Sequence, residues 1–197
     1  MNVLGIDGSG RGGGNTAVLV RGFLDGAREA GCRTEMFPLA DWRIGGCTAC
    51  KACKKTQRCV LDDDMRRFYQ VAPETDVLFL ASPIYLDHIT AQLMAFIQRT
   101  YCYLGAALEN HYPRKTARAV LGITYGAGDP KGYQYVLDWL AERLEGYFGI
   151  PTLATFTIAG TTHEPIILAD HPEVRRARAF GAALAAGHGD PRAGGGV

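Results

Sequence analysis

The chain has 197 residues, its formal net charge is +1, and 47% of its residues are hydrophobic. This length fits one domain with a substantial core, and the composition excludes an intrinsically disordered chain. The balanced charge argues against nucleic acid or a membrane surface as a partner, and no apolar run reaches the roughly 18–20 residues of a membrane span. Six cysteines without a secretion signal predict a cytoplasmic protein whose clustered thiols bind metal or do redox chemistry instead of forming disulfides.

Apolar runs and segments with helical spacing alternate along the chain. The predicted strands are the segments 3–6, 33–39, 77–80, 119–123 and 153–158. The predicted helices are the segments 16–30, 90–103, 130–147 and 171–186. Continuous apolar runs of this length are typical of parallel strands that helices cover on both faces, whereas the more polar segment 33–39 suits an edge strand.

This alternation predicts an α/β fold. We expect a flavodoxin-like, doubly wound, five-stranded parallel sheet in a three-layer α/β/α arrangement. A six-stranded dinucleotide-binding fold is the alternative, for which the chain is a little short. The domain is predicted to span 1–186, followed by a glycine-rich disordered tail at 187–197. Within the domain, the cysteine-rich connection 40–61 is long for a compact fold and therefore indicates a functional segment.

A glycine-rich loop at 7–16 follows the first predicted strand and leads into a helix. Backbone N–H groups, the helix dipole and the side chains of Ser9, Arg11 and Thr16 can together bind one phosphate. The loop lacks the Gly-Lys-Ser/Thr ending of a P-loop, and the last glycine of its G-x-G-x-x-G match is misplaced. We therefore expect a phosphate site here, with a flexible turn as the alternative.

Two further loops follow strands at the same edge of the predicted sheet. In the loop 82–88, Pro83 stiffens the turn and Tyr85 can lie against a flat ring. The alternative is an ordinary turn with a half-buried tyrosine. His88 is either a hydrogen-bond donor to that ring or a plain polar loop residue. In the loop 124–129, Gly126 and Gly128 allow backbone amides to approach a ligand closely. Together the three loops predict a mononucleotide with a flat ring, such as FMN.

Four cysteines fall within thirteen residues with the spacing C-x2-C-x2-C-x5-C: Cys47, Cys50, Cys53 and Cys59. Compact runs of this kind are typical of iron–sulfur clusters, whereas structural zinc more often takes two separated pairs. Redox-active free thiols and a zinc site remain the alternatives. The other two cysteines, Cys32 and Cys102, are predicted to be buried structural thiols.

The surroundings of these cysteines are basic. From 43 to 58 the charged residues are Arg43, Lys51, Lys54, Lys55 and Arg58. Such charges stabilise an anionic cluster, lower thiol pKa values and attract an acidic electron donor or an NADPH phosphate, although each single lysine is expected to be solvated. The acidic run 62–64 suits the first turn of a helix, and the apolar stretch 99–108 is predicted to contact another subunit.

Several motifs resemble one known family. They are Gly8-Ser9-x-Arg11-x-x-Gly14-Asn15-Thr16, the four cysteines, the acidic run ending in Met65, Ser82-Pro83-x-Tyr85, and Ala91-Gln92-Leu93. Over roughly its first hundred residues the chain looks like the iron–sulfur flavoprotein branch of the NADPH-dependent FMN reductase family. The resemblance implies a flavodoxin-like fold, bound FMN, a homodimer or homotetramer and, in this branch, a [4Fe–4S] cluster near the flavin.

The resemblance also implies roles for individual residues. The FMN phosphate is expected on Ser9, Arg11, Asn15 and Thr16. The isoalloxazine ring is expected against Pro83, Ile84 and Tyr85, with Tyr125 and Gly126 on its other side. The cluster ligands are expected to be the four cysteines. The chain departs from the family pattern at Asp7, Gly10 and Met94, and the carboxylate of Asp7 must point away from the phosphate or be paired.

The expected function is redox chemistry at FMN, in which the cofactor carries the reaction and the protein tunes it. The expected donors are NAD(P)H or a ferredoxin-like protein, and the expected acceptors are a quinone, another flavin or dioxygen. A cluster-free NAD(P)H-dependent FMN or quinone reductase is the first alternative. A non-catalytic flavodoxin-type electron carrier and a thiol or zinc redox sensor are alternatives of another class.

Overall fold

The structure is a computed structural model that describes residues 1–161, 167 and 169–185. Its strands are β1 (Asn2–Asp7), β2 (Arg33–Pro38), β3 (Val77–Tyr85), β4 (His88–Ile89), β5 (Arg118–Thr124) and β6 (Thr152–Ile158). Its helices are α1 (Asn15–Glu29), α2 (Cys53–Thr56), α3 (Met65–Val71), α4 (Ala91–Arg99), α5 (Gln134–Phe148) and α6 (Pro172–Ala185). The 3-10 turns are η1 (Leu39–Asp41), η2 (Ala72–Glu74) and η3 (Thr100–Tyr103).

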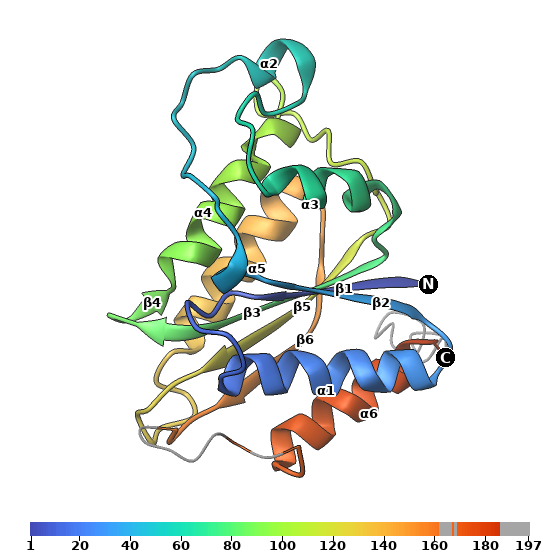
Figure 1. Cartoon of the computed structure of the whole chain (residues 1–197), viewed down its shortest axis with the longest axis vertical. Helices are drawn as coiled ribbons and strands as arrows, with labels where there is room; N and C mark the ends of the chain where they lie inside the picture. The colour runs from blue at the N-terminus through green and yellow to red at the C-terminus, as the bar shows by residue number, and fades with distance from the viewer. Residues whose placement is uncertain (162–166, 168, 186–197) are drawn as a thin grey trace, which may run out of the picture.

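Five parallel strands form the sheet in the order β2-β1-β3-β5-β6. Helices α1 and α6 cover one face, and α3, α4 and α5 cover the other (Figure 1). The predicted three-layer α/β/α fold is therefore confirmed, and its strand order is the flavodoxin-like one. The prediction did not include β4, a two-residue strand that pairs antiparallel with the end of β3.

The core lies on both faces of the sheet. In β3, Val77 and Phe79 belong to the cluster on the α1 side, whereas Leu78 and Leu80 belong to the cluster on the opposite side. This explains why the run is continuously apolar. Helices α1 and α6 pack closely because α1 carries a glycine at their contact: a Cβ on Gly26 would lie 1.9 Å from the carbonyl oxygen of Arg178.

Two predicted helices differ from the observed ones. The segment predicted as one helix over 90–103 is α4 followed by the tighter turn η3. The helix predicted to begin at 130 begins at Gln134, because the carboxylate of Asp129 accepts a hydrogen bond from the Lys131 amide (2.9 Å) and holds the preceding residues in a turn. The predicted tail 187–197 lies outside the described residues. None of the helices in the described part of the chain has the length and apolar character needed to cross a membrane.

Candidate cofactor sites

The loop between β1 and α1 is tied to the strands and helix beside it. The amide of Gly8 donates to the carbonyl of Ala81 (2.7 Å), and the Thr90 hydroxyl donates to the carbonyl of Gly8 (2.5 Å). The same hydroxyl accepts from the Leu93 amide (3.1 Å) and so caps α4. One threonine, which the sequence analysis did not single out, therefore holds the loop against β3 and α4.

The four residues predicted to hold a phosphate lie together at the start of α1. No side chain caps this helix end, so its first N–H groups are available to an anion. Ser9 is buried, and its hydroxyl accepts from the Arg11 amide (3.2 Å). The Thr16 hydroxyl shares a hydrogen bond with Thr124 (2.9 Å), and Asn15 Oδ1 accepts from the Ile167 amide (2.9 Å).

Asp7 lies directly under this loop and is fully buried. Its Oδ1 accepts a hydrogen bond from the Ser9 amide (3.0 Å), which gives the carboxylate one partner. Its Oδ2 is buried and has no hydrogen-bond partner among the described residues. Burial raises the pKa of Asp7 to about 6, with the Ser9 amide acting in the opposite direction. Keeping the Asp7 carboxyl charged beside a phosphate site therefore costs free energy.

The loops expected to border a flat ring lie at the same edge of the sheet. Tyr85 ends β3 and is 52% exposed, and it is followed by Leu86 and Asp87, both with positive φ. A tyrosine pair from the start of α5 holds this turn: Tyr133 donates to Asp87 Oδ1 (2.8 Å), and Tyr135 donates to its carbonyl (2.5 Å). Neither tyrosine was predicted, because each reaches the turn only through the tertiary fold.

Tyr125, Gly126 and Gly128 lie where the second side of the flat-ring site is expected. Tyr125 is buried, its hydroxyl donates to the carbonyl of Asp129 (2.8 Å), and its ring meets Tyr133 edge-on at 4.8 Å. Gly128 is open, since a Cβ there would meet nothing within 4 Å. His88 packs edge-on against Trp139 of α5 (4.8 Å), and Pro83 and Ile84 are half-buried at the end of β3.

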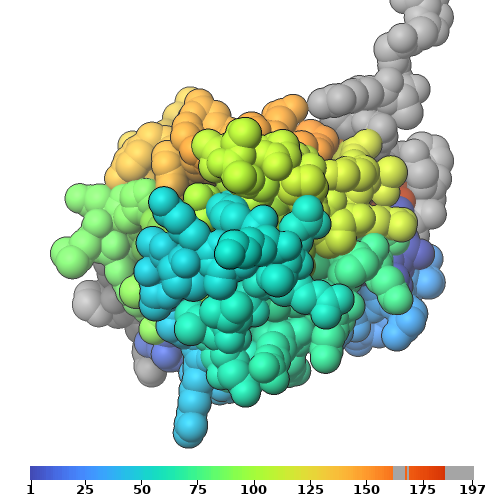
Figure 2. Space-filling view, turned by 90° about the horizontal axis from the view of Figure 1, so that it is seen from above, coloured from blue at the N-terminus to red at the C-terminus, as the bar shows by residue number. Residues whose placement is uncertain are grey.

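The cysteine loop projects from the end of the molecule where α4 and η3 lie (Figure 1). Seen from above, it lies beside the segment around η3 (Figure 2). Cys47 and Cys50 are exposed, Cys53 is buried, Cys59 is half-buried, and all four thiols are free. All four line one small cavity of about 20 Å³, which Arg99, Tyr101 and Cys102 also line.

This cavity has the donor set that a four-iron cluster takes. Among the described residues, no three His, Cys, Asp or Glu side chains surround a point where a single metal ion could sit. Ala49, Lys51 and Gln57 adopt positive φ although none is glycine, and strained backbone of this kind clusters at functional sites.

One prediction around the cysteines needs correction and another gains a detail. Lys54 is not a solvated lysine: its Nζ donates to the carbonyls of Leu104 (2.6 Å) and Tyr101 (3.2 Å) and lies 3.4 Å from the centre of the Tyr101 ring. Cys102 is buried as predicted, and burial raises the pKa of its thiol to about 11. However, it also lines the cysteine cavity, so the structure places a fifth thiol beside the four.

The acidic run after Cys59 was predicted in the first turn of a helix, but it lies immediately before α3, whose first turn contains no acidic residue. Asp63 Oδ1 accepts from the Met65 amide (3.2 Å), which satisfies a donor of the first turn. Asp64 reaches back to the Arg43 amide (2.7 Å), and Asp62 pairs with Arg66 (2.8 Å) at the surface. Asp63 also pairs with Arg99, a buried cation that the sequence analysis assigned only to an apolar stretch.

Two larger hollows flank the cysteine cavity. An apolar groove of about 680 Å³ runs between α4, η3 and α5 and includes Met94, Ile97, Tyr101 and Trp139, with Cys47 at its rim. A polar cleft of about 820 Å³ on the other side is lined by Cys59 and Cys102, together with Arg58, Arg66 and His111. The thiols are thus reachable from two chemically different surfaces.

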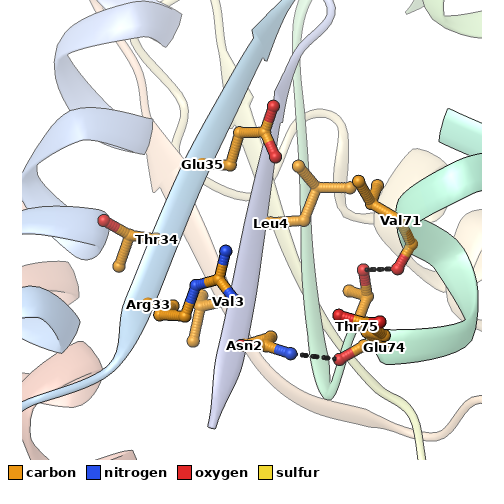
Figure 3. A pocket seen from close by; sticks show the side chains of 9 residues that line it. All are labelled: Asn2, Val3, Leu4, Arg33, Thr34, Glu35, Val71, Glu74 and Thr75. Carbon is orange, nitrogen blue, oxygen red and sulfur yellow. Dashed lines mark hydrogen bonds between the residues drawn. The ribbon is translucent and has the colours of Figure 1, made fainter. Parts of the chain in front are cut away.

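A further pocket lies at the opposite end of the sheet. It is lined by Asn2, Arg33, Glu35, Glu74 and Thr75, among others (Figure 3). Its polar groups already bond one another, since Asn2 donates to the carbonyl of Glu74 (2.9 Å) and Thr75 donates to that of Val71 (2.9 Å). Ligands of open α/β sheets bind at the carboxyl ends of the strands, so we assign this pocket no role.

Comparisons with known proteins agree with this arrangement of sites. Residues 1–163 match the family described as NADPH-dependent FMN reductase. An iron–sulfur flavoprotein of Methanosarcina thermophila is 31% identical over 142 residues, which cover 71% of this chain and 73% of that protein. The iron–sulfur flavoprotein MJ1083 of Methanocaldococcus jannaschii is 38% identical over 100 residues, which cover 51% of this chain and 52% of that protein.

A solved structure shows the same fold at lower identity. The NAD(P)H:quinone oxidoreductase from Methanothermobacter marburgensis superposes with a TM-score of 0.69 at 17% identity. The superposition covers 93% of this chain and 96% of that one. At this identity the likeness supports the flavodoxin-like fold alone.

Proposed function

The chain belongs to the NADPH-dependent FMN reductase family, in its iron–sulfur flavoprotein branch, and we propose that it is an electron-transfer enzyme with two cofactors. FMN would bind at the carboxyl edge of the sheet and a [4Fe–4S] cluster in the cysteine loop. The observation that carries this proposal is the presence of two separate sites built from different segments. One is an uncapped helix end beside a glycine-rich loop, and the other is a cavity lined by four free thiols.

At the first site the chain binds and orients. The first N–H groups of α1 would hold the FMN phosphate, with the exposed guanidinium of Arg11 over it. Tyr85 and Tyr125 would border the ring, in positions that Tyr133 and Tyr135 help to hold. FMN, when bound, supplies both hydride and single-electron chemistry. The proposed redox reaction at FMN requires no side chain to act as a general acid or base.

At the second site the chain supplies sulfur ligands and positive charge. Cys47, Cys50, Cys53 and Cys59 would hold the cluster, which supplies one-electron transfer. The exposed charges of Lys51, Lys55 and Arg58 suit an acidic, ferredoxin-like electron donor, and NAD(P)H is the alternative donor at the flavin. A quinone, another flavin or dioxygen would accept the electrons.

We further propose that the chain forms a homodimer or homotetramer through its apolar groove. The groove continues onto Leu108 and Tyr147, which are 50% and 39% exposed, and large apolar surfaces of this kind mark interfaces. A second copy there would also cover Cys47 at the rim and so limit access of oxygen to the thiols. Sedimentation of the wild type and of a Leu108→Glu variant tests this, because an interface through the groove requires the variant to dissociate.

The experiment that tests the function is spectroscopy of protein purified without oxygen. Flavin bands together with about four irons and about four sulfides per chain support the two-cofactor enzyme. Reduction of the flavin by NADH, NADPH or a reduced ferredoxin, followed stepwise, then identifies the donor. Flavin without iron leaves a cluster-free reductase, and flavin without any steady turnover leaves an electron carrier or a sensor.

A further inference from the structure

A buried charge near the cysteines belongs to Arg99, the last residue of α4. Its side chain has no exposed surface. Both terminal nitrogens bind the carboxylate of Asp63, Nη1 at 2.5 Å and Nη2 at 3.0 Å. Nη1 also donates to the carbonyl of Gly45 (2.9 Å). A bidentate pair of this kind is geometrically specific, and a buried charge is retained only where it is fully paired.

The two partners of this guanidinium flank the cysteine loop. Gly45 precedes Cys47, and Asp63 follows Cys59, so a single side chain ties both ends of the segment that carries all four thiols. Asp63 strengthens the closure because it also accepts from the Gly45 amide (3.4 Å). The backbone of Arg99 is also fixed, because the Tyr69 hydroxyl donates a hydrogen bond to the Arg99 carbonyl (3.0 Å).

The same guanidinium lies beside a thiol. Arg99 lines the cysteine cavity and interacts there with the side chain of Cys59. Its Nε is also buried and has no hydrogen-bond partner among the described residues. A buried donor without a partner is costly, and a guanidinium that interacts with a cysteine gains a charged partner when that sulfur is a thiolate that binds metal.

We propose that Arg99 is a positioning residue of the cysteine site: it closes the loop through Gly45 and Asp63 and offers its remaining N–H groups to the Cys59 thiolate. The part that concerns a bound cluster rests on the proposed function, whereas the closure of the loop does not. Hydrogen bonds to the ligand sulfurs raise the reduction potential of an iron–sulfur cluster, and outer partners of this kind hold metal sites together.

Two variants separate the parts of this proposal. Arg99→Lys keeps the charge but loses the fork and the Nε donor. Arg99→Met combined with Asp63→Asn removes both charges, which avoids leaving a carboxylate buried without a partner. Arg114→Gln is the control, because it breaks the ion pair with Asp76 far from the cysteines.

The first measurement uses the full-length chain without a cluster. Alkylation of each cysteine is followed by mass spectrometry, with buried Cys32 as the internal reference. Opening of the loop is expected to speed alkylation of Cys59 about tenfold in both Arg99 variants and not in Arg114→Gln. Alkylation at the wild-type rate in both Arg99 variants, or equal acceleration in the control, would overturn the proposal.

The second measurement uses the chain with its cluster reconstituted without oxygen. Iron is expected to pass to a chelator about 10- to 100-fold faster from both Arg99 variants, and the cluster potential is expected to fall. Wild-type iron retention and potential in the double variant would restrict Arg99 to the structural ion pair and overturn its role toward Cys59. If the wild type assembles no cluster, the proposed function fails, and the alkylation measurement still decides whether Arg99 closes the loop.

Discussion

The glycine-rich loop 7–16, where the phosphate is expected (the phosphate loop), and the cysteine-rich connection 40–61 (the cysteine loop) are stabilised in different ways. The phosphate loop follows a central strand, and its backbone bonds directly to β3 and to Thr90. The cysteine loop contains non-glycine residues at positive φ and is held by Arg99 of α4 and by the bonds of its own Lys54 to the carbonyls of Tyr101 and Leu104. A site on a short turn is set mainly by backbone geometry, whereas a site on a long loop depends on side chains from distant segments.

The largest expected effect tests whether the two sites are independent. Cys50→Ser is expected to abolish iron binding while FMN remains bound, because the phosphate loop shares no residue with the cysteine loop. Iron assays and flavin absorbance measure this, with Cys32→Ser as the control for loss of a thiol elsewhere. Loss of flavin from a folded Cys50→Ser protein would show that the two sites are coupled.

The next effect concerns the buried carboxyl of the phosphate loop. Because the pKa of Asp7 is raised from 3.8 to about 6, the native state binds more protons than the unfolded state between these values. Stability conferred by protonated Asp7 is therefore complete below about pH 4 and is lost as the pH rises through about 6. At higher pH, Asp7→Asn is expected to raise the free energy of unfolding by up to about 3 kcal/mol.

Urea unfolding at about pH 4 and about pH 8 measures this difference, since the linkage falls between them. Asp138→Asn, a change at an exposed carboxyl of α5, is the control. A gain for Asp7→Asn that is equal at both pH values would contradict the assignment, because only a titrating group makes the difference depend on pH.

A smaller effect is expected at the threonine that joins the phosphate loop to α4. Thr90→Ala removes the cap on Leu93 and the hydrogen bond to Gly8, and is expected to cost about 1–2 kcal/mol of stability. FMN affinity is expected to fall with it, while iron content stays unchanged. Thr90→Ser keeps the hydroxyl and should restore both values in thermal unfolding and flavin titration.

The smallest effect is expected at the surface of the phosphate site. Arg11→Ala is expected to weaken FMN binding about tenfold, because an exposed guanidinium contributes only the lower range of a charged hydrogen bond. Fluorescence titration with FMN and with riboflavin, which lacks the phosphate, measures this. The loss should appear for FMN alone, and an equal loss for riboflavin would place the phosphate elsewhere.

Local patterns were enough for much of the fold and for the outline of both sites. The apolar runs predicted β1, β3 and β5 because these strands are largely buried on both faces, as β3 illustrates, whereas the more polar β2 was predicted as an edge strand. The cysteine spacing predicted a shared thiol site because its members lie close in sequence. The short strand β4 was missed because two residues carry no periodic signal.

The sequence by itself determined the layer architecture, the position of the glycine-rich loop and the set of four clustered thiols, since each depends on neighbouring residues. Only the tertiary structure decided that Arg99 and Cys102 reach the thiols, that Tyr133 and Tyr135 hold the turn at Asp87, and that Asp7 is buried. These contacts join residues far apart in the chain, and their identity depends on how helices and strands pack rather than on any local pattern.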